Sequence, residues 1–438
     1  MKVAVLTDFT YLPPQYGLVP TVLAQLDTLI KHGVDTTLIV MEGFQNHVDA
    51  KKIPKEVKVL PVVPFMHLFD YSLGSKEQEF PVGPIGTIVD GAPQTNLKKQ
   101  IALATEMLDI HLPAFDVVIT HDILYQTWKI PFNAAIRAIA DKHPNIKWVH
   151  WCHSAPQPRP HNIDYPDTLR FTSMPNSVWV SPNESMASGY ALQFNVGIDK
   201  VKAVYHQINL DEMMRHPLSI ELLHKHKLND ASILIVCPTR IDHALGKRLD
   251  KIAALAGHLN KLTPTKLLFL NSWSGGEANH DTVNWIRSAA IKTGMTPENI
   301  IFSSEHDKKY TNGVPHQVVF DMLQLSNVFI QASEAETFSL ITAEAAICKN
   351  LLILNGDLTL MRELYGNSAM FVEFGCSWGG DTVTRHYQPN EDAFMFDRAK
   401  EIVEYLKTNK PLLANRTALL KFNEDWVYKN QLRPLLEG

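Results

Sequence analysis

Short apolar runs rich in β-branched residues alternate with segments of helical periodicity along most of this 438-residue chain. Such alternation is typical of parallel sheets whose two faces are both covered by helices. It occurs in two consecutive series, separated by a polar, helix-prone connector at residues 211–230. Because the chain is too long for one ordinary α/β layer, we expect two Rossmann-like domains whose parallel sheets face each other across a cleft.

The strands and helices of both series follow from this pattern. In the first series we expect strands at residues 3–6, 36–40, 57–60, 116–120, 147–151, 178–180 and 201–204. Helices are expected between them, notably at residues 21–31, 97–110, 133–141 and 182–194. The last of these begins with Ser181-Pro-Asn-Glu184, a capping box with proline at the first helical position. In the second series we expect strands at residues 233–237, 266–270, 299–302, 328–331, 351–354 and 369–372.

The domain boundaries are expected at breaks in this rhythm. We predict an N-terminal, acceptor-side domain over residues 1–210 and a C-terminal, nucleotide-sugar-binding domain over residues 211–415. Residues 416–438 are expected to form a helix that packs back toward the N-terminal domain, with Trp426 and Tyr428 as packing anchors. Residues 42–96 are rich in Pro and Gly and have little periodicity. Long irregular segments are usually functional, so we interpret this one as acceptor-side loops.

Composition excludes several classes of protein. The formal net charge is −5 and no run of five like charges occurs, so no electrostatic footprint for nucleic acid or an acidic membrane is visible. No stretch approaches the length of apolar sequence that spans a bilayer, and the N-terminus leads directly into a first strand. The four cysteines are widely spaced without a C-x-x-C pair, which is typical of reduced thiols. We therefore expect a soluble, cytoplasmic protein.

The segment from Val328 to Cys348 carries the strongest functional pattern. It predicts a buried strand, a polar loop and then a helix that begins near Ser339. Helix N-termini present unpaired backbone N–H groups and a positive dipole end, so residues 337–340 are suited to an anion such as a diphosphate. Glu336 precedes this helix and Glu344 lies inside it. Both carboxylates can accept hydrogen bonds from sugar hydroxyls.

The pattern Ser333-x-x-Glu336-x-Phe338-Ser339-x-x-x-x-Glu344 resembles the E-x7-E signature of glycosyltransferase family 4 and related retaining GT-B enzymes. The resemblance implies that Glu336 holds hydroxyls of the transferred sugar and Glu344 the ribose of the nucleotide. It also implies that Phe338, Ser339 and Leu340 bind the donor. Ser339 stands where the family usually has glycine. Serine retains the backbone N–H of that position but leaves less space near the sugar.

Neighbouring segments extend the resemblance. The strand that ends at Arg240, followed by Lys247 and Arg248, is similar to the family's strand, arginine and lysine that grip the donor diphosphate. It implies that Arg240 and Lys247 stabilise the leaving group. Lys247 lies further along the chain from Arg240 than the family's lysine usually does, so Lys247 and Arg248 remain alternatives for that role.

The first half of the chain shows weaker counterparts. Gly17 precedes the first helix and resembles the family's opening loop, where glycine lets the backbone approach donor phosphates or the acceptor. The G-x-G-x-x-G fingerprint of dinucleotide enzymes is absent there. The strands at 116–120 and 147–151 lead into His121 and His153, and we expect both to reach the cleft. The resemblance implies that His121 approaches the transferred sugar and that His153 lines the acceptor side.

The resemblance implies a hexosyltransferase-like retaining enzyme that moves a sugar from a nucleotide-sugar, with a UDP-sugar as the favoured donor, to an acceptor hydroxyl. No cofactor is expected, and no metal, because cationic side chains and a helix terminus can neutralise the departing diphosphate. No D-x-D motif stands as an obvious metal site.

Several questions stay open at this point. A sugar phosphorylase or synthase on the same fold, a non-catalytic two-lobed binding scaffold and, with weaker support, a nucleoside-binding epimerase are the alternatives. The acceptor is a lipid-linked sugar, a metabolite, a polysaccharide or, against the acidic net charge, a hydroxylated base of DNA. Cations that an anionic acceptor would meet are Lys98, Lys99, Lys142, Lys147, Arg159 and Arg170. The oligomeric state does not follow from the sequence.

Overall fold

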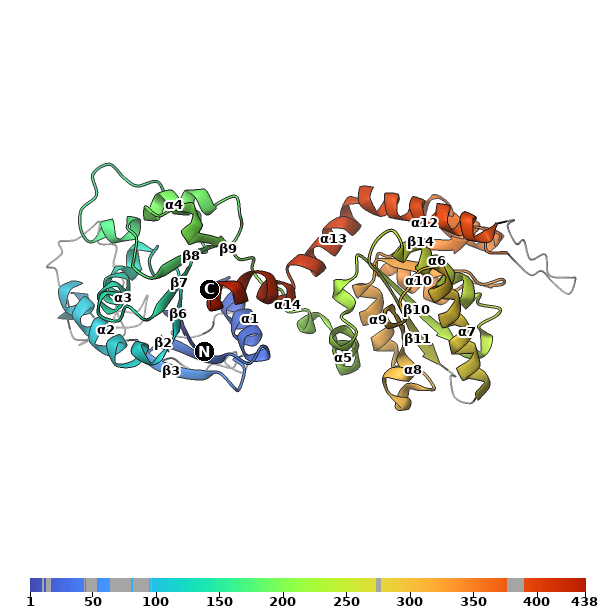
Figure 1. Cartoon of the computed structure of the whole chain (residues 1–438), viewed down its shortest axis with the longest axis horizontal. Helices are drawn as coiled ribbons and strands as arrows, with labels where there is room; N and C mark the ends of the chain where they lie inside the picture. Colours follow the sequence, from blue (N-terminus) through green and yellow to red (C-terminus); the bar gives the residue numbers. More distant parts are fainter. Residues whose placement is uncertain are drawn as a thin grey trace, which may run out of the picture. The chain divides into compact units, whose positions relative to one another are not determined.

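The computed structural model forms two compact units, Met1–Ile208 with Phe422–Gly438, and Asn209–Lys421. Each unit is a parallel sheet flanked by helices (Figure 1), so the predicted α/β class with two Rossmann-like domains is confirmed. In the part of the chain that the structure describes, no helix is both long and apolar enough to cross a membrane. The described residues are 1–9, 12, 17–42, 44, 53–63, 80–81, 94–95, 97–272, 277–375 and 390–438.

The sheet of the first unit has, among the described residues, seven parallel strands in the order β3-β2-β1-β6-β7-β8-β9. The order reverses between β1 and β6, which makes their carboxyl ends the switch point of this sheet. A separate antiparallel pair is formed by β4 (Phe80–Pro81) and β5 (Gln94–Thr95). The strands of the main sheet are β1 (Lys2–Leu6), β2 (Asp35–Met41), β3 (Lys58–Val63), β6 (Val117–His121), β7 (Lys147–Trp151), β8 (Ser177–Ser181) and β9 (Val201–Ala203).

Alternating side chains of these strands build two cores. Ala4 and Leu6 of β1 pack on one face, and Val3 and Val5 pack on the other, because successive side chains of a strand point to opposite faces. The first face is covered by helices α2 (Leu97–His111), α3 (Ile130–Lys142) and α4 (Ala187–Phe194). The second is covered by α1 (Leu18–Lys31) and by the C-terminal residues of the chain.

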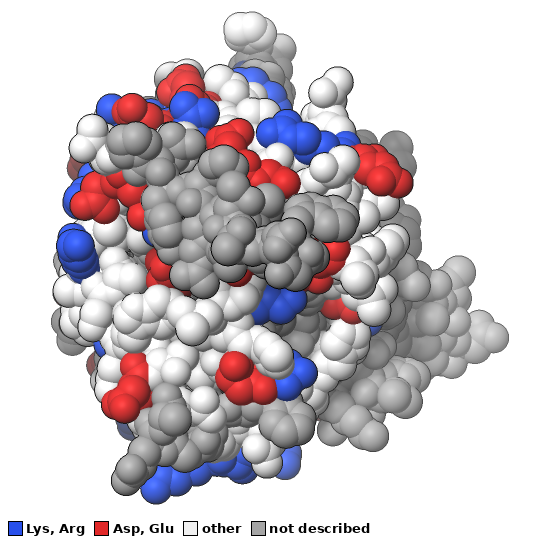
Figure 2. All heavy atoms as spheres, turned by 90° about the vertical axis from the view of Figure 1, so that its right-hand side faces the viewer, with Lys and Arg blue, Asp and Glu red and all other residues white. Residues whose placement is uncertain are grey.

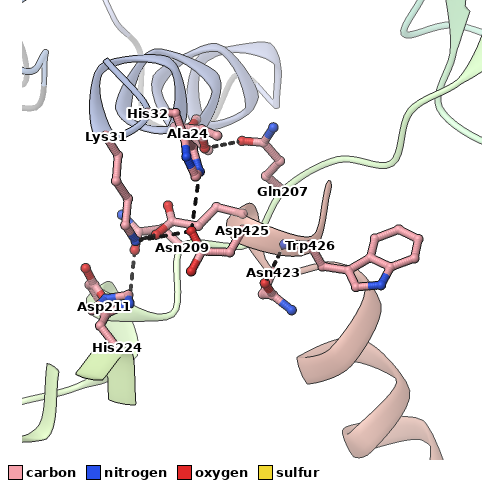
Figure 3. A network of polar contacts seen from close by, with 12 residues as sticks. Ala24, Lys31, His32, Gln207, Asn209, Asp211, His224, Asn423, Asp425 and Trp426 are labelled. Carbon is pink, nitrogen blue, oxygen red and sulfur yellow. Dashed lines mark hydrogen bonds and ion pairs between the residues drawn. The ribbon is translucent and has the colours of Figure 1, made fainter. Parts of the chain in front are cut away.

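The C-terminal segment completes the first unit. It comprises α14 (Glu424–Val427), a π-helical segment η13 (Tyr428–Leu432) and α15 (Arg433–Glu437). Val427 and Leu432 are fully buried in the same core as Val3. Figure 3 shows Lys31 and His32, at the end of α1, reaching toward α14. Lys31 pairs with Glu424 and lies 3.7 Å from Asp425, while the His32 ring stacks on Tyr428 at a centroid distance of 3.7 Å.

The boundary of this segment differs from the prediction of residues 416–438. Residues 416–421 belong to the second unit, as the end of α13 (Lys410–Lys421). The reason is Arg416, whose buried guanidinium donates to the backbone carbonyls of Leu228, Ala231 and Leu325. These bonds hold α13 on the second unit. The functional assignments of the two domains remain predictions.

The capping box predicted at Ser181 is wrong. Ser181 is the last residue of β8, and its hydroxyl donates to the Asn183 carbonyl instead of accepting from the amide of Glu184. Asn183 takes the accepting role two residues later, because its Oδ1 accepts from the Met186 amide at 2.9 Å. Helix α4 therefore begins at Ala187.

The second unit contains a parallel sheet with six strands in its described part, in the order β12-β11-β10-β13-β14-β15. Its order reverses between β10 and β13, which places a second switch point at their carboxyl ends. Each strand expected in the second series overlaps one of these. They are β10 (Ile233–Arg240), β11 (Thr265–Ser272), β12 (Ile300–Phe302), β13 (Val328–Gln331), β14 (Leu351–Asn355) and β15 (Met370–Val372).

Helices cover both faces of this sheet as well. One face packs against α6 (Leu249–Asn260), α7 (Glu277–Thr293) and α12 (Glu391–Thr408). The other packs against α5 (Pro217–Lys225), α9 (His316–Leu325), α10 (Leu340–Ile347), α11 (Thr359–Tyr365) and α13. A short helix, α8 (Ser303–His306), follows β12. The carboxyl ends of β10 and β13 remain uncovered by these layers, and the candidate site lies there.

Candidate functional site

A cavity of about 660 Å³ opens at the switch point of the second unit. Its wall is formed by the ends of β10 and β13, the loops that follow them and residues 312–314 before α9. Ligands of open α/β sheets bind at such a position, because the loops diverge there to opposite sides of the sheet. The cavity is therefore the candidate binding site that the topology favours, independently of any sequence motif.

Three polar side chains meet inside this cavity. Lys247 Nζ forms an ion pair with Oε1 of Glu336, and Gln331 Nε2 donates to the same oxygen at 3.0 Å. All three residues line the wall. Two donors on one oxygen hold the carboxylate in a single orientation. Among the described groups none bonds Oε2 of Glu336, which remains available to a hydroxyl of a ligand.

Gln331 was missed by the sequence reasoning. The side chain is 5% exposed, yet its Oε1 has no hydrogen-bond partner in the described part of the chain. A buried acceptor without a partner costs roughly 1–3 kcal/mol, so its retention in a cavity points to a function. The signal in the sequence was a polar residue at the last position of an otherwise apolar strand.

The cations near the cavity have different surroundings. Arg240, at the end of β10, lines the wall with a half-exposed side chain and binds Asp242 through contacts of 3.1 and 2.6 Å. That hydrogen bond raises the pKa of Arg240 and lowers the pKa of Asp242. Arg248 is instead buried, and it binds Glu334 at 3.3 Å and the Phe374 carbonyl at 3.0 Å. Of the two alternatives, Lys247 faces the cavity.

Helix α10 begins at Leu340, as predicted, with Ser339 at its N-cap. Ser339 has φ 67° and ψ 73°, the left-handed region that costs an L-residue about 1–2 kcal/mol. This backbone conformation is one that glycine adopts without strain, and glycine is the usual residue at this place in the E-x7-E signature that the segment resembles. Its hydroxyl lies 2.8 Å from that of Thr342. Phe338 and Leu340 are exposed and do not line the cavity.

Glu344 lies beside the cavity, not in its wall. Its Oε1 contacts His316 Nε2 at 3.1 Å, and His316 begins α9, directly after the loop that lines the cavity. Ile341, one turn earlier on α10, does belong to the wall. The structure thus groups Arg240, Lys247 and Glu336 in one cavity, with Glu344 one helical turn away.

His121 and His153 lie at the carboxyl ends of β6 and β7, next to the switch point of the first unit. His121 Nδ1 is 2.8 Å from His153 Nε2, and His121 Nε2 is 3.0 Å from Gln25 Oε1. Because an amide oxygen can only accept, His121 Nε2 carries the hydrogen. His121 Nδ1 then accepts from His153 Nε2, and His153 Nδ1 is left as an acceptor. Gln25, on α1, was not anticipated from the sequence.

Both histidines are held neutral by their surroundings. His121 is fully buried, and burial, followed by the neighbouring His153 and Lys129, lowers its pKa well below the ordinary value. Burial, followed by His206 and Lys129, lowers the pKa of His153 to about 3. Lys129 is itself buried and lies 3.0 Å from Asp8. The ring of His121 lies inside this network, and its expected approach to the cleft remains a prediction.

Gly17 occupies a position that does not require glycine. It immediately precedes α1 with φ −55°, and an added Cβ would meet no atom of the described residues within 4 Å. Its contact with a ligand remains a prediction. Most of the segment 42–96 predicted as acceptor-side loops lies outside the described residues, as does Cys376. Cys152 and Cys237 are buried free thiols, and Cys348 is a partly buried one.

No protein-family model matches the chain, and no curated protein matches it. Solved structures with similar folds include a glycosyltransferase from Rickettsia africae, at 14% identity and a TM-score of 0.36, covering 100% of this chain and 98% of that chain. Sucrose-phosphate synthase from Thermosynechococcus elongatus has 13% identity and a TM-score of 0.37, covering 100% and 99%. HepE from Anabaena in complex with UDP and glucose has 12% identity and a TM-score of 0.33, covering 99% of each chain. At these values the similarity assigns no function to this chain.

Proposed function

We propose that this chain is a retaining glycosyltransferase that moves a sugar from a nucleotide-sugar, preferably a UDP-sugar, to an acceptor hydroxyl. The observation that carries the proposal is the convergence of Arg240, Lys247 and Glu336 on one cavity at the switch point of the second unit. The E-x7-E resemblance assigns these same residues to the donor. The GT-B arrangement of the two domains across a cleft stays a prediction from the sequence.

The diphosphate of the donor would lie near the cations of this cavity. Lys247 and Arg240 line its wall, and the first turn of α10 offers backbone N–H groups that have no partner within the helix. Together they would neutralise the departing diphosphate, so the proposal includes no metal and no cofactor. Glu336 Oε2 would accept from hydroxyls of the transferred sugar, while Lys247 and Gln331 hold its Oε1.

The nucleotide would extend toward α9 and α10. Glu344 is proposed to bind the ribose, and His316 contacts its Oε1 at 3.1 Å. A ribose diol can bind a carboxylate through two hydroxyls, which suits a partly exposed glutamate. Phe338, Ser339 and Leu340, at the start of α10, would lie against the donor.

The reaction that we propose is the one that the E-x7-E resemblance implies. The acceptor oxygen attacks the anomeric carbon from the face that the diphosphate leaves. The bond from that carbon to the diphosphate oxygen breaks as the new glycosidic bond forms, and the acceptor proton passes to the departing phosphate oxygen. Atoms and charge balance without a protein nucleophile. The protein contributes orientation and stabilisation of the charge on the leaving group.

The acceptor is proposed to bind the first unit. His121 would approach the transferred sugar, and His153, whose Nδ1 is an acceptor, would receive a hydrogen bond from the acceptor hydroxyl. A nucleic-acid acceptor is disfavoured by the net charge of −5. On the face drawn in Figure 2, basic and acidic side chains are interspersed, which offers no single-sign patch to a polyanion.

The test is a panel of UDP-, GDP-, ADP- and dTDP-sugars without metal, with thermal shift for binding and donor hydrolysis for turnover. We expect one nucleotide class to bind and to be hydrolysed, and the variant Glu336→Gln to bind it without hydrolysis. Binding of a nucleotide without turnover in any condition would favour a non-catalytic scaffold. Sugar release that requires inorganic phosphate would favour a phosphorylase. Failure of every nucleotide to bind would overturn the proposal.

A further inference from the structure

A second cavity, of about 790 Å³, lies in the first unit, away from His121. It opens at the amino ends of β7 and β8 and at the edge strand β9, the opposite edge of the sheet from the switch point. Figure 1 shows the C-terminus of the chain close to this sheet. The wall is formed by the loop that leads into β8, the segment 196–203 and residues of η13 and α15. Its wall includes none of the residues proposed to bind the donor and neither of the two histidines, and Lys147 is the one residue in it that the sequence offered as a cation for an anionic acceptor.

Three lysines line this cavity, Lys147 at the start of β7 and Lys200 and Lys202 around β9. The strand register places Lys202 beside Val180, and Lys200 ends the short 3-10 helix η6 (Ile198–Lys200) directly before β9. Because alternate residues share one face of a sheet, Lys202 and Val178 lie on the same face. Lys147 shares that face through Val149, which packs in the same core as Val180. All three lysines line the one cavity, Lys147 partly buried and Lys200 and Lys202 exposed.

The charges of this wall are not balanced pair by pair. In the described part of the chain, no ion pair is formed by Lys147, Lys200 or Lys202. Asp199 supplies the acidic side chain of the wall. Burial lowers the pKa of Lys147, with no neighbouring carboxylate to offset it. In the cavity of the second unit, by contrast, the corresponding cations already contact carboxylates of the protein.

We propose that the cavity lined by Lys147, Lys200 and Lys202 binds a phosphate-bearing anion. Phosphate oxygens accept hydrogen bonds from ammonium groups, and lysine is a common phosphate ligand because it acts as a point charge. A bound dianion would offset three like charges that otherwise repel one another around one space. Val178, Pro434 and Leu435 supply an apolar part of the wall for the organic portion of the ligand.

The position of this site defines its use. It lies at the edge of the sheet opposite to the histidines, so its ligand does not take part in glycosyl transfer and is bound for anchoring or regulation. Phosphate of this kind occurs in soluble phosphate esters and in lipid headgroups. The two sources share the recognition chemistry and differ in what the cavity must accommodate beyond the phosphate.

The first experiment labels lysine amines of the full chain with an acylating reagent and resolves the sites by peptide mass spectrometry. Labelling is compared with and without pyrophosphate at constant ionic strength. We expect pyrophosphate to slow the labelling of Lys147, Lys200 and Lys202, with no effect on the exposed controls Lys2, Lys55 and Lys58. Equal labelling of the three cavity lysines with and without pyrophosphate overturns the proposal. Slower labelling of Lys247 in the presence of pyrophosphate would show binding at the donor cavity of the second unit, which is a separate result.

The second experiment compares two variants that lose the same charge. One carries Lys147→Gln, Lys200→Gln and Lys202→Gln, and the other carries Lys2→Gln, Lys55→Gln and Lys58→Gln. Loss of charge-assisted bonds should weaken pyrophosphate binding to the first unit about tenfold or more in the cavity variant only. A third variant with arginine at the three cavity positions should retain binding and excludes a general loss of structure. Equal affinity of the two glutamine variants overturns the proposal.

The source of the phosphate is decided with vesicles. Phosphatidylcholine vesicles with and without phosphatidic acid are mixed with the wild-type chain and with the cavity variant. Co-sedimentation that requires both phosphatidic acid and the cavity lysines supports a lipid headgroup. Protection of these lysines by pyrophosphate without such co-sedimentation supports a soluble phosphate ester. If neither pyrophosphate nor vesicles with phosphatidic acid protect the three lysines from labelling, the proposed site does not exist.

Discussion

Lys247 and Glu336, 89 residues apart in the sequence, form an ion pair in the cavity of the second unit. The pair joins the loop after β10 to the loop after β13, the two strands between which the sheet order reverses. Gln331 donates to the same oxygen of Glu336. The carboxylate that we propose to bind the sugar is thus held in one orientation by the protein itself. Lys247, which holds Glu336, is also the cation that we propose to contact the diphosphate. The sugar-binding and diphosphate-binding parts of the proposed donor site therefore share Lys247.

Lys247 faces the cavity and Arg248 is buried, so substitutions at the two positions should have different effects. Lys247→Ala should lower kcat by about 10²–10³-fold, because a group that stabilises the leaving charge is removed. Its effect on unfolding should stay within about 1 kcal/mol, as for an exposed ion pair. Arg248→Ala should cost about 3–5 kcal/mol of unfolding free energy, because it leaves Glu334 buried without its cation. Steady-state kinetics and urea unfolding measure the two effects.

The opposite pattern would reverse the assignment. If Arg248→Ala abolished turnover at unchanged stability while Lys247→Ala turned over normally, Arg248 would be the diphosphate ligand. The conservative variant Lys247→Arg serves as control, since it keeps the charge in the cavity.

Gln331→Leu should reduce activity without reducing stability. The substitution removes one of the two donors that orient Glu336, and kcat should fall about tenfold. It also removes the buried oxygen that has no partner among the described residues. The free energy of unfolding should therefore stay constant or rise by up to about 1 kcal/mol.

A double-mutant cycle checks that Gln331 acts through Glu336. In a Glu336→Ala background the substitution Gln331→Leu should have no further effect on kcat. If the losses of kcat from Glu336→Ala and Gln331→Leu simply add, Gln331 contacts the donor directly. KM for the donor should change less than kcat if the role of Gln331 is to position the carboxylate.

Most of the fold follows from the sequence because the strands are buried on both faces. Segments such as 233–237 and 351–354 are continuous apolar runs, and this is the strongest local signal of a central parallel strand. Helix α12 was not predicted, although Met395, Ala399 and Ile402 have helical spacing and face the core. It follows a segment without a clear pattern, residues 376–389, which gave no start signal.

The candidate site could be predicted only in part. Glu336 and Arg240 were found because a motif marks them, and motifs preserve the residue type at a fixed spacing. Gln331 and Gln25 belong to no motif. Each forms its hydrogen bond with a side chain elsewhere in the fold, and Gln25 and its partner His121 are 96 residues apart in the sequence. Polar contacts of this kind are set by strand order and register, which local patterns do not encode.

The backbone at Ser339 gives a prediction about stability. Ser339 has φ 67°, so Ser339→Gly relieves strain of about 1–2 kcal/mol and loses about 0.5–1 kcal/mol through the greater freedom of the unfolded chain. We expect a net gain of about 0.5 kcal/mol. Ser339→Val should destabilise by about 1–3 kcal/mol, because a β-branched residue is disfavoured in this conformation. Thermal unfolding of the wild-type chain and of the two variants measures the order of their stabilities. A Ser339→Val variant more stable than Ser339→Gly would contradict the prediction.

The histidine pair of the first unit predicts a loss of stability in mild acid. Burial lowers the pKa of His153 to about 3 in the folded chain, whereas an unfolded histidine titrates near 6.5. Below pH 6.5 the unfolded state therefore binds the proton and the folded state does not. Stability is fully present above about pH 6.5 and is lost as the pH falls toward 3, by up to about 1.4 kcal/mol per pH unit for this group.

The variant His153→Gln tests this contribution. A glutamine amide can still donate to His121 Nδ1, but it does not titrate, so its unfolding free energy should fall less steeply between pH 6.5 and 5 than that of the wild-type chain. Other groups near the pair are His206, Lys129 and Asp122, whose carboxylate accepts from the His153 amide at 2.8 Å. They remain in both chains, so their titration cancels in the comparison. The exposed His161→Gln should keep the wild-type slope, and identical slopes for His153→Gln and the wild-type chain would show that His153 is protonated in the folded state.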